Sequence, residues 1–251
     1  MTTMEEKRAA NDSRSDGRDW SDLRDIRFDR HFTKNTPGSV QVSFGDTRVL
    51  CTAMVSDGVP AFLQGKGRGW LTAEYSMLPS ATNTRRSRDR GGRVDGRSVE
   101  IQRLIGRSLR AVMDFDVLGE RTIWVDCDVL QADGGTRTAS ITGAYVAVYD
   151  LLRDLSERRH LRGWPLPHQV GAVSVGVLDG RAIVDLCYTE DRDADVDMNL
   201  VMNSEGEFIE VQGSAEGLAF SRELLDTMLG SGEAAIRRIF ELQREVLSAE
   251  S

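Results

Sequence analysis

The stretch DCDVLQADGGTRTASIT, residues Asp126–Thr142, ends an apolar run in a glycine turn and then opens a helical pattern. Residues 122–130 are rich in β-branched and apolar side chains, which predicts a buried strand. From Ala139 to Leu152 the apolar residues recur with helical spacing. The stretch therefore predicts a strand, a tight turn and a helix, in that order.

The turn has the composition of an anion-binding site. Gly134 and Gly135 permit a sharp bend that exposes backbone N–H groups, and the following helix directs its unpaired donors to the same place. Thr136 adds a hydroxyl, and Arg137 adds a guanidinium whose fork binds phosphate through two parallel hydrogen bonds. The alternative is a plain strand-to-helix turn with Thr136 or Thr138 as N-cap. Arg137 favours phosphate, because a cation in the first turn opposes the helix dipole.

The composition fits a globular protein with a sizeable core. The chain has 251 residues, 40% of them apolar, which suits one large domain or two smaller ones. Its formal net charge of −8 excludes a surface coated with basic charge but leaves local cationic patches open. No apolar stretch reaches the length of a membrane span, and the N-terminal residues lack the apolar core of a signal peptide. We therefore expect a cytoplasmic protein with no membrane partner.

The cysteines and histidines show no metal-site spacing. The cysteines are far apart and each lies in an apolar, strand-like run, so we expect reduced core residues: Cys51, Cys127 and Cys187. The histidines are isolated and lack the close spacing of zinc ligands. Neither a zinc site nor a nucleophilic triad is supported.

A second cationic feature follows Pro79. Arginines crowd a glycine-containing stretch without apolar periodicity, which predicts a mobile basic loop: Arg85, Arg86, Arg88, Arg90, Arg93 and Arg97. The simplest alternative is a solvated loop, or one packed on an acidic neighbour. In an acidic protein we favour a polyanion as the partner, because flexible arginines can follow a phosphodiester backbone without reading its sequence.

The basic loop leads into a predicted helix over residues 98–113, with Asp95 or Ser98 as its N-cap. Arg97 therefore lies at a helix start. Like Arg137, it is a cation where helix energetics favour an anion. This placement makes Arg97 a second candidate phosphate ligand.

The first half of the chain is predicted to begin as a β-meander. Strand patterns precede the central strand over residues 23–32, 39–44, 47–55 and 70–75. Residues 1–17 are polar and charged and are expected to form a disordered tail. The first domain is therefore expected to span residues 18–162.

A second half, residues 168–247, is expected after the chain-breaking sequence GWPLP, residues 163–167. Its elements are predicted as strands over 170–177, 182–188, 198–202 and 208–211 and a helix over 221–247. Gly230 and Gly232 raise the alternative of an interruption in that helix. The order of strands, helices, strands and a helix predicts an α+β, or mixed α/β, fold in two similar halves.

Carboxylates gather between two strand patterns of the second half, in the sequence EDRDADVD, residues 190–197. Asp191 closes one predicted strand and Asp197 opens the next, which would bring their side chains together at one end of a sheet. Acidic loops are most often only solvating. Paired carboxylates, however, are suited to Mg²⁺, which completes its shell with water and substrate phosphate.

The chain also carries long motifs in a fixed order: GSVQVSFGDTRVLCTA, GWLTAEYSMLP, GRSVEIQRLIGRSLRA, DCDVLQADGGTRTASITGA, AVSVGV, YTEDRDADVDMN and EVQGSAEG. With these motifs it resembles the ribonuclease PH family of bacterial phosphorolytic exoribonucleases over nearly everything after Arg18. The resemblance implies the fold of that family: a half like the second domain of ribosomal protein S5, followed by a similar C-terminal β/α half.

The resemblance also implies a function. It implies a phosphorolytic 3′→5′ exoribonuclease, a nucleotidyltransferase that trims the 3′ ends of precursor tRNA and other RNA. Inorganic phosphate would be the nucleophile and nucleoside 5′-diphosphates the products, in a reversible reaction. A homohexameric ring, built as a trimer of dimers, is implied as well. The alternatives are a Mg²⁺-dependent hydrolytic ribonuclease and a non-catalytic RNA-binding ring subunit.

Site residues are implied residue by residue. The family's phosphate ligands fall on Arg97, Gly135, Thr136 and Arg137. Its carboxylates for Mg²⁺ binding or acid–base catalysis fall on Asp191 and Asp197, and its RNA-guiding arginines fall on Arg85 and Arg88. The chain departs from the family's usual pattern at Ser15, Ser80 and Arg192. None of these departures touches the expected phosphate ligands or the two aspartates.

Overall fold

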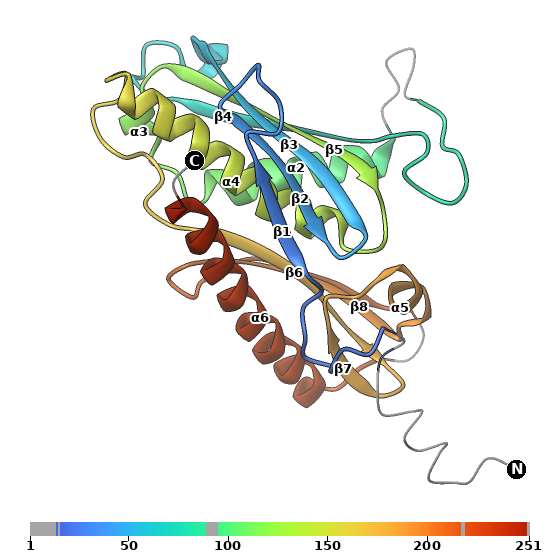
Figure 1. Ribbon diagram of the computed structural model, residues 1–251. Helices are drawn as coiled ribbons and strands as arrows, with labels where there is room; N and C mark the ends of the chain where they lie inside the picture. The colour runs from blue at the N-terminus through green and yellow to red at the C-terminus, as the bar shows by residue number, and fades with distance from the viewer. Residues whose placement is uncertain (1–13, 15, 89–94, 217–218, 250–251) are drawn as a thin grey trace, which may run out of the picture.

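Two β-sheets and the helices packed on them build the fold in the computed structural model of the chain (Figure 1). The structure describes residue 14 and residues 16–88, 95–216 and 219–249. Residues 1–13 and Ser15 of the predicted tail, and Arg90 and Arg93 of the predicted basic loop, lie outside the described residues.

Within the described residues, the first sheet has five strands in the order β1-β2-β3-β5-β4. Their bounds are Ile26–Arg30 (β1), Gly38–Phe44 (β2), Thr47–Asp57 (β3), Trp70–Met77 (β4) and Arg121–Gln131 (β5). β4 and β5 pair in parallel, whereas the other neighbours pair antiparallel. The parallel pair requires a crossover, which α2 (Gly96–Arg110) and the short α3 (Phe115–Leu118) supply. A 3-10 turn, η1 (Ala61–Leu63), precedes β4.

The second sheet, over the same described part of the chain, has four antiparallel strands in the order β7-β6-β8-β9. Their bounds are Val170–Leu178 (β6), Arg181–Val184 (β7), Val196–Asn203 (β8) and Phe208–Ala215 (β9). The long helix α6 (Arg222–Ser248) packs against β6, β7 and β8, and the short helix α5 (Tyr188–Asp193) connects β7 to β8 (Figure 1).

Helix α4 (Thr136–Glu157) links the two sheets. It packs against β2 and β3 of the first sheet and against β6 of the second. Its buried residues are distributed around the whole helix rather than along one stripe, as expected for a helix enclosed by the core. One large apolar cluster consequently extends from Val40 and Ile123 to Val173 and Ile236. The two predicted halves share one core.

The α+β prediction and the order of its elements are confirmed, but several local predictions are wrong. The predicted strand over 182–188 ends at Val184, because buried Asp185 has a φ of +53° and leaves the extended conformation. Residues 188–193 then form α5, whose start is stabilised by a capping box between Cys187 and Glu190. Asp191 therefore lies on a helix rather than at a strand end, and Cys187 is a partly exposed N-cap rather than a core residue. Cys51 and Cys127 are buried as expected.

Two further predictions concern the ends of the chain. The tail was expected to include residues 14–17, yet Arg14 is only 4% exposed because its guanidinium pairs with buried Glu190. The predicted final helix is confirmed, without the interruption raised as an alternative: α6 passes through Gly230 and Gly232 as one element. Its apolar face, which packs on the second sheet, outweighs the low helix propensity of glycine.

The close packing of α4 on β2 and β3 gives a test of the core. A β-carbon on Gly143 of α4 would lie 2.5 Å from Cγ1 of Val42 and 3.0 Å from Sγ of Cys51. Gly143→Ala is therefore expected to lower the free energy of unfolding by about 1–3 kcal/mol, because an overpacked core must shift. Urea unfolding measures the change.

Gly230→Ala in α6 is the matched control for Gly143→Ala. A β-carbon at residue 230 meets nothing within 4 Å. Alanine should therefore stabilise this helix position by about 0.5–1 kcal/mol through its better helix propensity. A Gly143→Ala variant as stable as Gly230→Ala would contradict the packing described for α4.

Candidate active site

Predicted site residues from both halves of the chain line one cleft of about 780 Å³: Arg97, Gly135, Thr136 and Asp191. The segment after β4 forms part of its wall, through residues that include Ser80, Thr82 and Arg86. Half-exposed Tyr188 of α5 forms another part. The cleft therefore lies where the start of α2, the start of α4 and the second half meet.

The turn before α4 is a backbone structure that requires glycine. Gly134 and Gly135 have φ values of +75° and +63°, and a β-carbon on Gly134 would lie 2.5 Å from the carbonyl oxygen of Leu186. Gly135 is the N-cap of α4, and no described side chain caps the first turn of this helix. Its first N–H groups therefore have no side-chain partner among the described residues, which is what an anion site requires.

The N-terminus of α2 has the same character. Arg97 is exposed in its first turn, and the N-cap residue Asp95 makes no side-chain capping hydrogen bond. Asp95 instead pairs with Arg86 at 3.2 Å. Arg97 and Arg137 both lower the pKa values of Asp191 and Asp197 by their positive charge, against the larger effect of burial. The two helix starts and the two carboxylates thus share one electrostatic neighbourhood.

Side chains that sequence reasoning missed hold Thr136 and Arg137. The Oγ1 of Thr136 lies 2.9 Å from the Oη of Tyr75, a buried residue of β4. Burial raises the pKa of the Tyr75 hydroxyl, which keeps it a neutral hydrogen-bonding group. The only signal for Tyr75 in the sequence is its inward position in the alternating pattern of β4.

The guanidinium of Arg137 is held by polar groups from two other elements. Its Nη1 donates to Oε1 of Gln212 on β9 at 3.1 Å and to Oε1 of Glu100 on α2 at 3.5 Å. The Nε2 of Gln212 also donates to Glu100, at 3.0 Å. No local pattern predicts this triad, because its members are brought together only by the tertiary fold.

Asp191 of α5 and Asp197 of β8 form the acidic side of the site. Burial raises the pKa of Asp197 to about 6, with a further contribution from the negative charge of Asp191. Burial also raises the pKa of Asp191. The influence of Asp191 on the pKa of Asp197 indicates that the two carboxyl groups lie in one neighbourhood, although one is on a helix. Such a pair can exchange a proton near neutral pH.

The same pair fits Mg²⁺ better than zinc. Over the residues that the structure describes, no group of three or more His, Cys, Asp and Glu side chains gathers as a metal site. Zinc sites require three or four such protein ligands. Mg²⁺ is commonly held by one or two carboxylates, with water and substrate phosphate completing its shell. Two partly buried carboxyl groups in the neighbourhood of the candidate anion site match that requirement.

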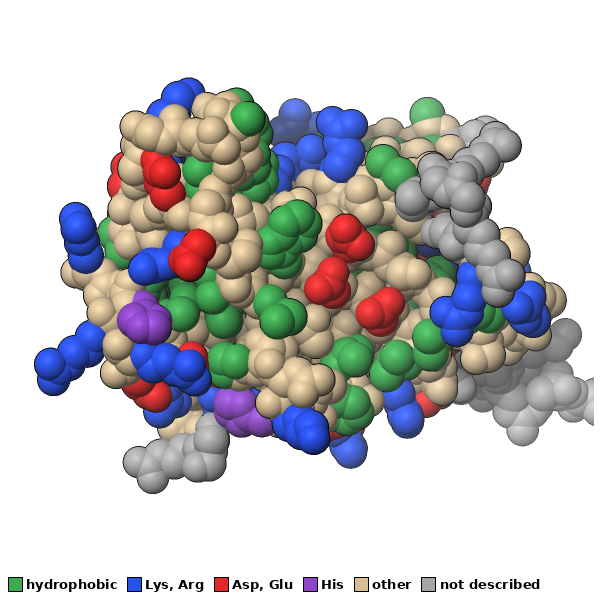
Figure 2. All heavy atoms as spheres, turned by 90° about the horizontal axis from the view of Figure 1, so that it is seen from above, with side chains coloured by type: hydrophobic (Ala, Val, Ile, Leu, Met, Phe, Trp, Pro, Cys, Tyr) green, Lys and Arg blue, Asp and Glu red, His purple; other side chains and the backbone are tan. Residues whose placement is uncertain are grey.

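The predicted RNA-guiding residues lie outside the cleft proper. Arg85 and Arg88 are exposed, in a segment that is neither helix nor strand. Arg88 lines a smaller neighbouring hollow of about 160 Å³, and Arg86 lines both this hollow and the cleft. Figure 2 shows basic and acidic side chains intermixed over one face of the molecule. The net charge of −8 therefore does not describe every part of the surface.

Family models and a curated relative both match this chain over most of its length. Residues 22–153 match the model of domain 1 of the 3′ exoribonuclease family, and residues 168–235 match that of its domain 2. The protein called ribonuclease PH from Synechococcus sp. (strain JA-2-3B'a(2-13)) is 55% identical over 240 residues, which cover 94% of this chain and 98% of that protein.

Two solved structures share the fold. Rice (Oryza sativa) Rrp46 has a TM-score of 0.76 at 22% identity, covering 94% of this chain and all of that one. A chain of the Archaeoglobus fulgidus exosome, solved with RNA bound to the active site, has a TM-score of 0.77 at 21% identity and covers 94% of both chains. At such low identity, these two structures support the fold alone.

The raised pKa of Asp197 makes this residue destabilising at neutral pH. Because the folded-state pKa of about 6 lies above the ordinary value of 3.8, the folded protein binds the proton more tightly than the unfolded chain does. The bound proton therefore stabilises the folded protein. This stabilisation is complete below about pH 4 and is lost as the pH rises through 6. Asp197→Asn should therefore stabilise the metal-free protein at pH 7.5 by about 1–2 kcal/mol, a value reduced because solvent screens a partly exposed carboxyl.

Urea unfolding in EDTA at pH 7.5 and pH 4 measures the effect, which should disappear at pH 4. Asp195→Asn is the control, because Asp195 is exposed on the short connection between the two aspartates. It is expected to change stability little at either pH. Destabilisation by Asp197→Asn at pH 7.5 would show that the carboxylate is a favourable partner in the free protein.

Proposed function

The chain belongs to the 3′ exoribonuclease family, and from that membership we propose that it trims the 3′ ends of precursor tRNA by phosphorolysis. It is a nucleotidyltransferase-type exoribonuclease that works in the 3′→5′ direction. The observation that carries the assignment to this cleft is the meeting of an uncapped glycine turn, two arginines at helix starts and a carboxyl pair. Phosphate and a metal-assisted phosphodiester are the substrates that such groups suit.

In the proposed reaction, an oxygen of inorganic phosphate attacks the phosphorus of the 3′-terminal nucleotide. A new P–O–P bond forms, and the bond from phosphorus to the 3′-oxygen of the preceding nucleotide breaks. The terminal residue leaves as a nucleoside 5′-diphosphate, and the shortened RNA keeps a 3′-hydroxyl. Since the diphosphate retains the energy of the broken bond, the reaction is reversible and adds nucleotides when diphosphates are abundant.

The attacking phosphate is held by Arg97, Arg137, the hydroxyl of Thr136 and the N–H of Gly135. The free N–H groups at the start of α4 support this role, as does the anchoring of Arg137 by Gln212 and Glu100. A fixed guanidinium needs no reorganisation when negative charge develops on the phosphoryl oxygens. Positioning of the nucleophile and neutralisation of charge are the main contributions of these groups.

The two aspartates serve the leaving group. Asp191 and Asp197 would hold Mg²⁺, which when bound offsets negative charge on the phosphoryl oxygens. One of the two carboxyl groups carries a proton to the departing 3′-oxygen. The raised pKa of Asp197 supports this role, because a carboxyl with a pKa of about 6 is partly protonated near neutral pH.

The longer RNA chain is guided by Arg85 and Arg88. Their exposure on an irregular segment next to the cleft supports contacts to successive phosphates. Assembly into a ring of six, as a trimer of dimers, is the proposed quaternary structure. It is supported by large apolar side chains that are exposed in the single chain, such as Met54, Phe62 and Trp124.

The cytoplasm is the proposed compartment. The free state of all three cysteines and the RNA substrate support it. In the part of the chain that the structure describes, no helix combines the length and the apolar character that a bilayer crossing requires.

The proposed function is tested with an RNA that carries a short 3′ extension, incubated with the protein and Mg²⁺, with and without inorganic phosphate. Nucleoside diphosphates released only with phosphate are the expected products. Phosphate-independent release of monophosphates would instead identify a hydrolytic ribonuclease. RNA binding without any release would identify a non-catalytic ring subunit.

Arg137→Ala tests the anion site itself. The variant should lose about 10²–10³-fold in kcat/KM, because it lacks a preorganised donor to the transferring phosphoryl group. The loss should be similar for phosphorolysis and for nucleotide addition, since both directions share one transition state. Arg107→Ala is the control, because Arg107 is an arginine of α2 that pairs with Glu210 rather than with the groups that hold Arg137. Wild-type rates for Arg137→Ala would refute the site.

A further inference from the structure

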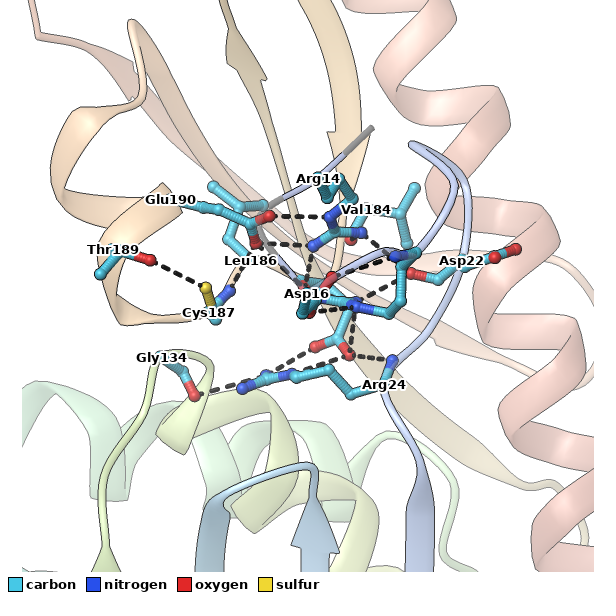
Figure 3. Close-up of polar contacts among 12 residues, drawn as sticks. Arg14, Asp16, Asp22, Arg24, Gly134, Val184, Leu186, Cys187, Thr189 and Glu190 are labelled. Atoms are coloured by element: carbon cyan, nitrogen blue, oxygen red, sulfur yellow. Dashed lines mark hydrogen bonds and ion pairs between the residues drawn. The ribbon is translucent and has the colours of Figure 1, made fainter. Parts of the chain in front are cut away.

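A mostly buried cluster of arginines and carboxylates, which the proposed reaction does not use, contacts the backbone of Asp133 and Gly134 at the cleft (Figure 3). It joins the segment before β1 to the backbone of both sides of the site. Its members, here called the arginine clasp, are Arg14, Arg18, Arg24, Asp185 and Glu190.

Arg24 forms the arm of the clasp that reaches the glycine turn. Its Nε and Nη2 donate to the two carboxylate oxygens of Asp185 at 3.0 and 2.7 Å. On the other side, its Nη1 donates to the carbonyl oxygen of Asp133 at 2.5 Å, and its Nη2 lies 3.5 Å from that of Gly134. One guanidinium therefore connects Asp185 of the second half to the two residues before Gly135.

Arg14 forms the arm that reaches α5. Its Nε and Nη2 donate to the two carboxylate oxygens of Glu190 at 2.8 and 2.6 Å. The same guanidinium donates to the carbonyl oxygens of Val184 at 2.8 Å and Asp185 at 2.9 Å. Glu190 also accepts from the backbone N–H of Cys187 at 2.9 Å, which caps α5. Arg14 thus holds the residue next to Asp191.

Asp185 is the point where the two arms meet. It is fully buried and has a φ of +53°, a conformation that non-glycine residues seldom adopt. Its carboxylate also accepts from the backbone N–H of Arg24 at 2.8 Å, and its carbonyl accepts from Arg14. The surrounding donors fix this unusual backbone conformation between β7 and α5.

A purely structural role accounts poorly for this arrangement. A buried ion pair contributes little net stability, because desolvation of the two charges offsets their attraction. What it does provide is a fixed geometry. Each arm of the clasp ends one residue away from a proposed ligand: Gly134 precedes Gly135, and Glu190 precedes Asp191. The clasp therefore sets the position of the anion site relative to the carboxyl pair.

We propose that Arg24 and Arg14 are positioning residues with separable effects. Arg24 fixes the turn that binds phosphate, and Arg14 fixes the helix that carries Asp191. The assignment rests on the proposed function, but the first arm has a readout that is independent of catalysis.

For Arg24, that readout is calorimetric binding of inorganic phosphate to the full chain. Arg24→Lys retains the positive charge but loses the fork that bridges Asp185 and the turn. The Kd for phosphate should rise about 10-fold or more, because a shift of about 1 Å is enough to disrupt an oriented site. RNA affinity should stay within about twofold, since the basic segment is untouched. Asp185→Asn, which keeps the shape of the side chain, is measured in place of any variant that does not fold.

For Arg14, the readout is a fall in kcat without a change in the Kd for phosphate. Arg14→Lys or Glu190→Gln should lower kcat by about 10–100-fold, because Asp191 is displaced, while the Kd for phosphate stays within about twofold. Arg27→Lys is the matched control. Arg27 is a strongly exposed arginine of β1 that pairs with Asp25, and its replacement should change neither quantity.

The outcomes separate the two proposals. A wild-type protein that binds phosphate but releases no diphosphates would refute the proposed function. The role of Arg24 would still be supported if the Arg24→Lys variant had the expected higher Kd for phosphate. Folded variants with the phosphate Kd and kcat of the wild type would overturn the clasp. Equal effects of Arg24→Lys and Arg14→Lys on both quantities would overturn the separable roles.

Discussion

Every α-helix begins with backbone N–H groups that have no partner inside the helix, and this constraint organises the molecule around α4. The body of α4 is enclosed by both sheets, so the helix cannot move without disturbing the shared core. Its first turn, in contrast, is uncapped and faces the cleft after two glycines with positive φ. Rigid packing at one end and unpaired donors at the other are what a preorganised anion site requires.

The second half of the chain completes this site. The carboxyl pair comes from α5 and β8, whereas the arginines come from the starts of α2 and α4. The two groups of charges influence each other, because Arg97 and Arg137 lower the pKa values of both carboxyl groups. Arg24 links the halves beside the site through Asp185, Asp133 and Gly134. The backbone N–H of Tyr188, which donates to the carboxylate of Asp133 at 3.2 Å, links them directly. The cleft and the arginine clasp both lie at the interface between the two halves of the chain. The cleft is open to substrate, whereas most of the clasp is shielded from solvent.

The parts of the fold that depend on local patterns were predictable from the sequence. The glycine turn, the buried strand before it and the helix after it follow from side-chain periodicity and glycine, and so does the position of Arg97 at a helix start. Helix α5 and the folded state of Arg14 were not predictable in this way. Both depend on Glu190, whose partner lies 176 residues away in the chain. Tyr75 and Gln212 escaped notice for the same reason, because their roles arise only from tertiary contacts.

The most direct test of the account is a crystal structure of the chain with tungstate, a phosphate analogue that anomalous scattering locates without ambiguity. If the glycine turn binds phosphate, a tungstate ion will lie within hydrogen-bonding distance of the Gly135 N–H, the Thr136 hydroxyl and the guanidinium of Arg137. An ion bound elsewhere, for example only along residues 85–88, with the glycine turn free of anion, would contradict it.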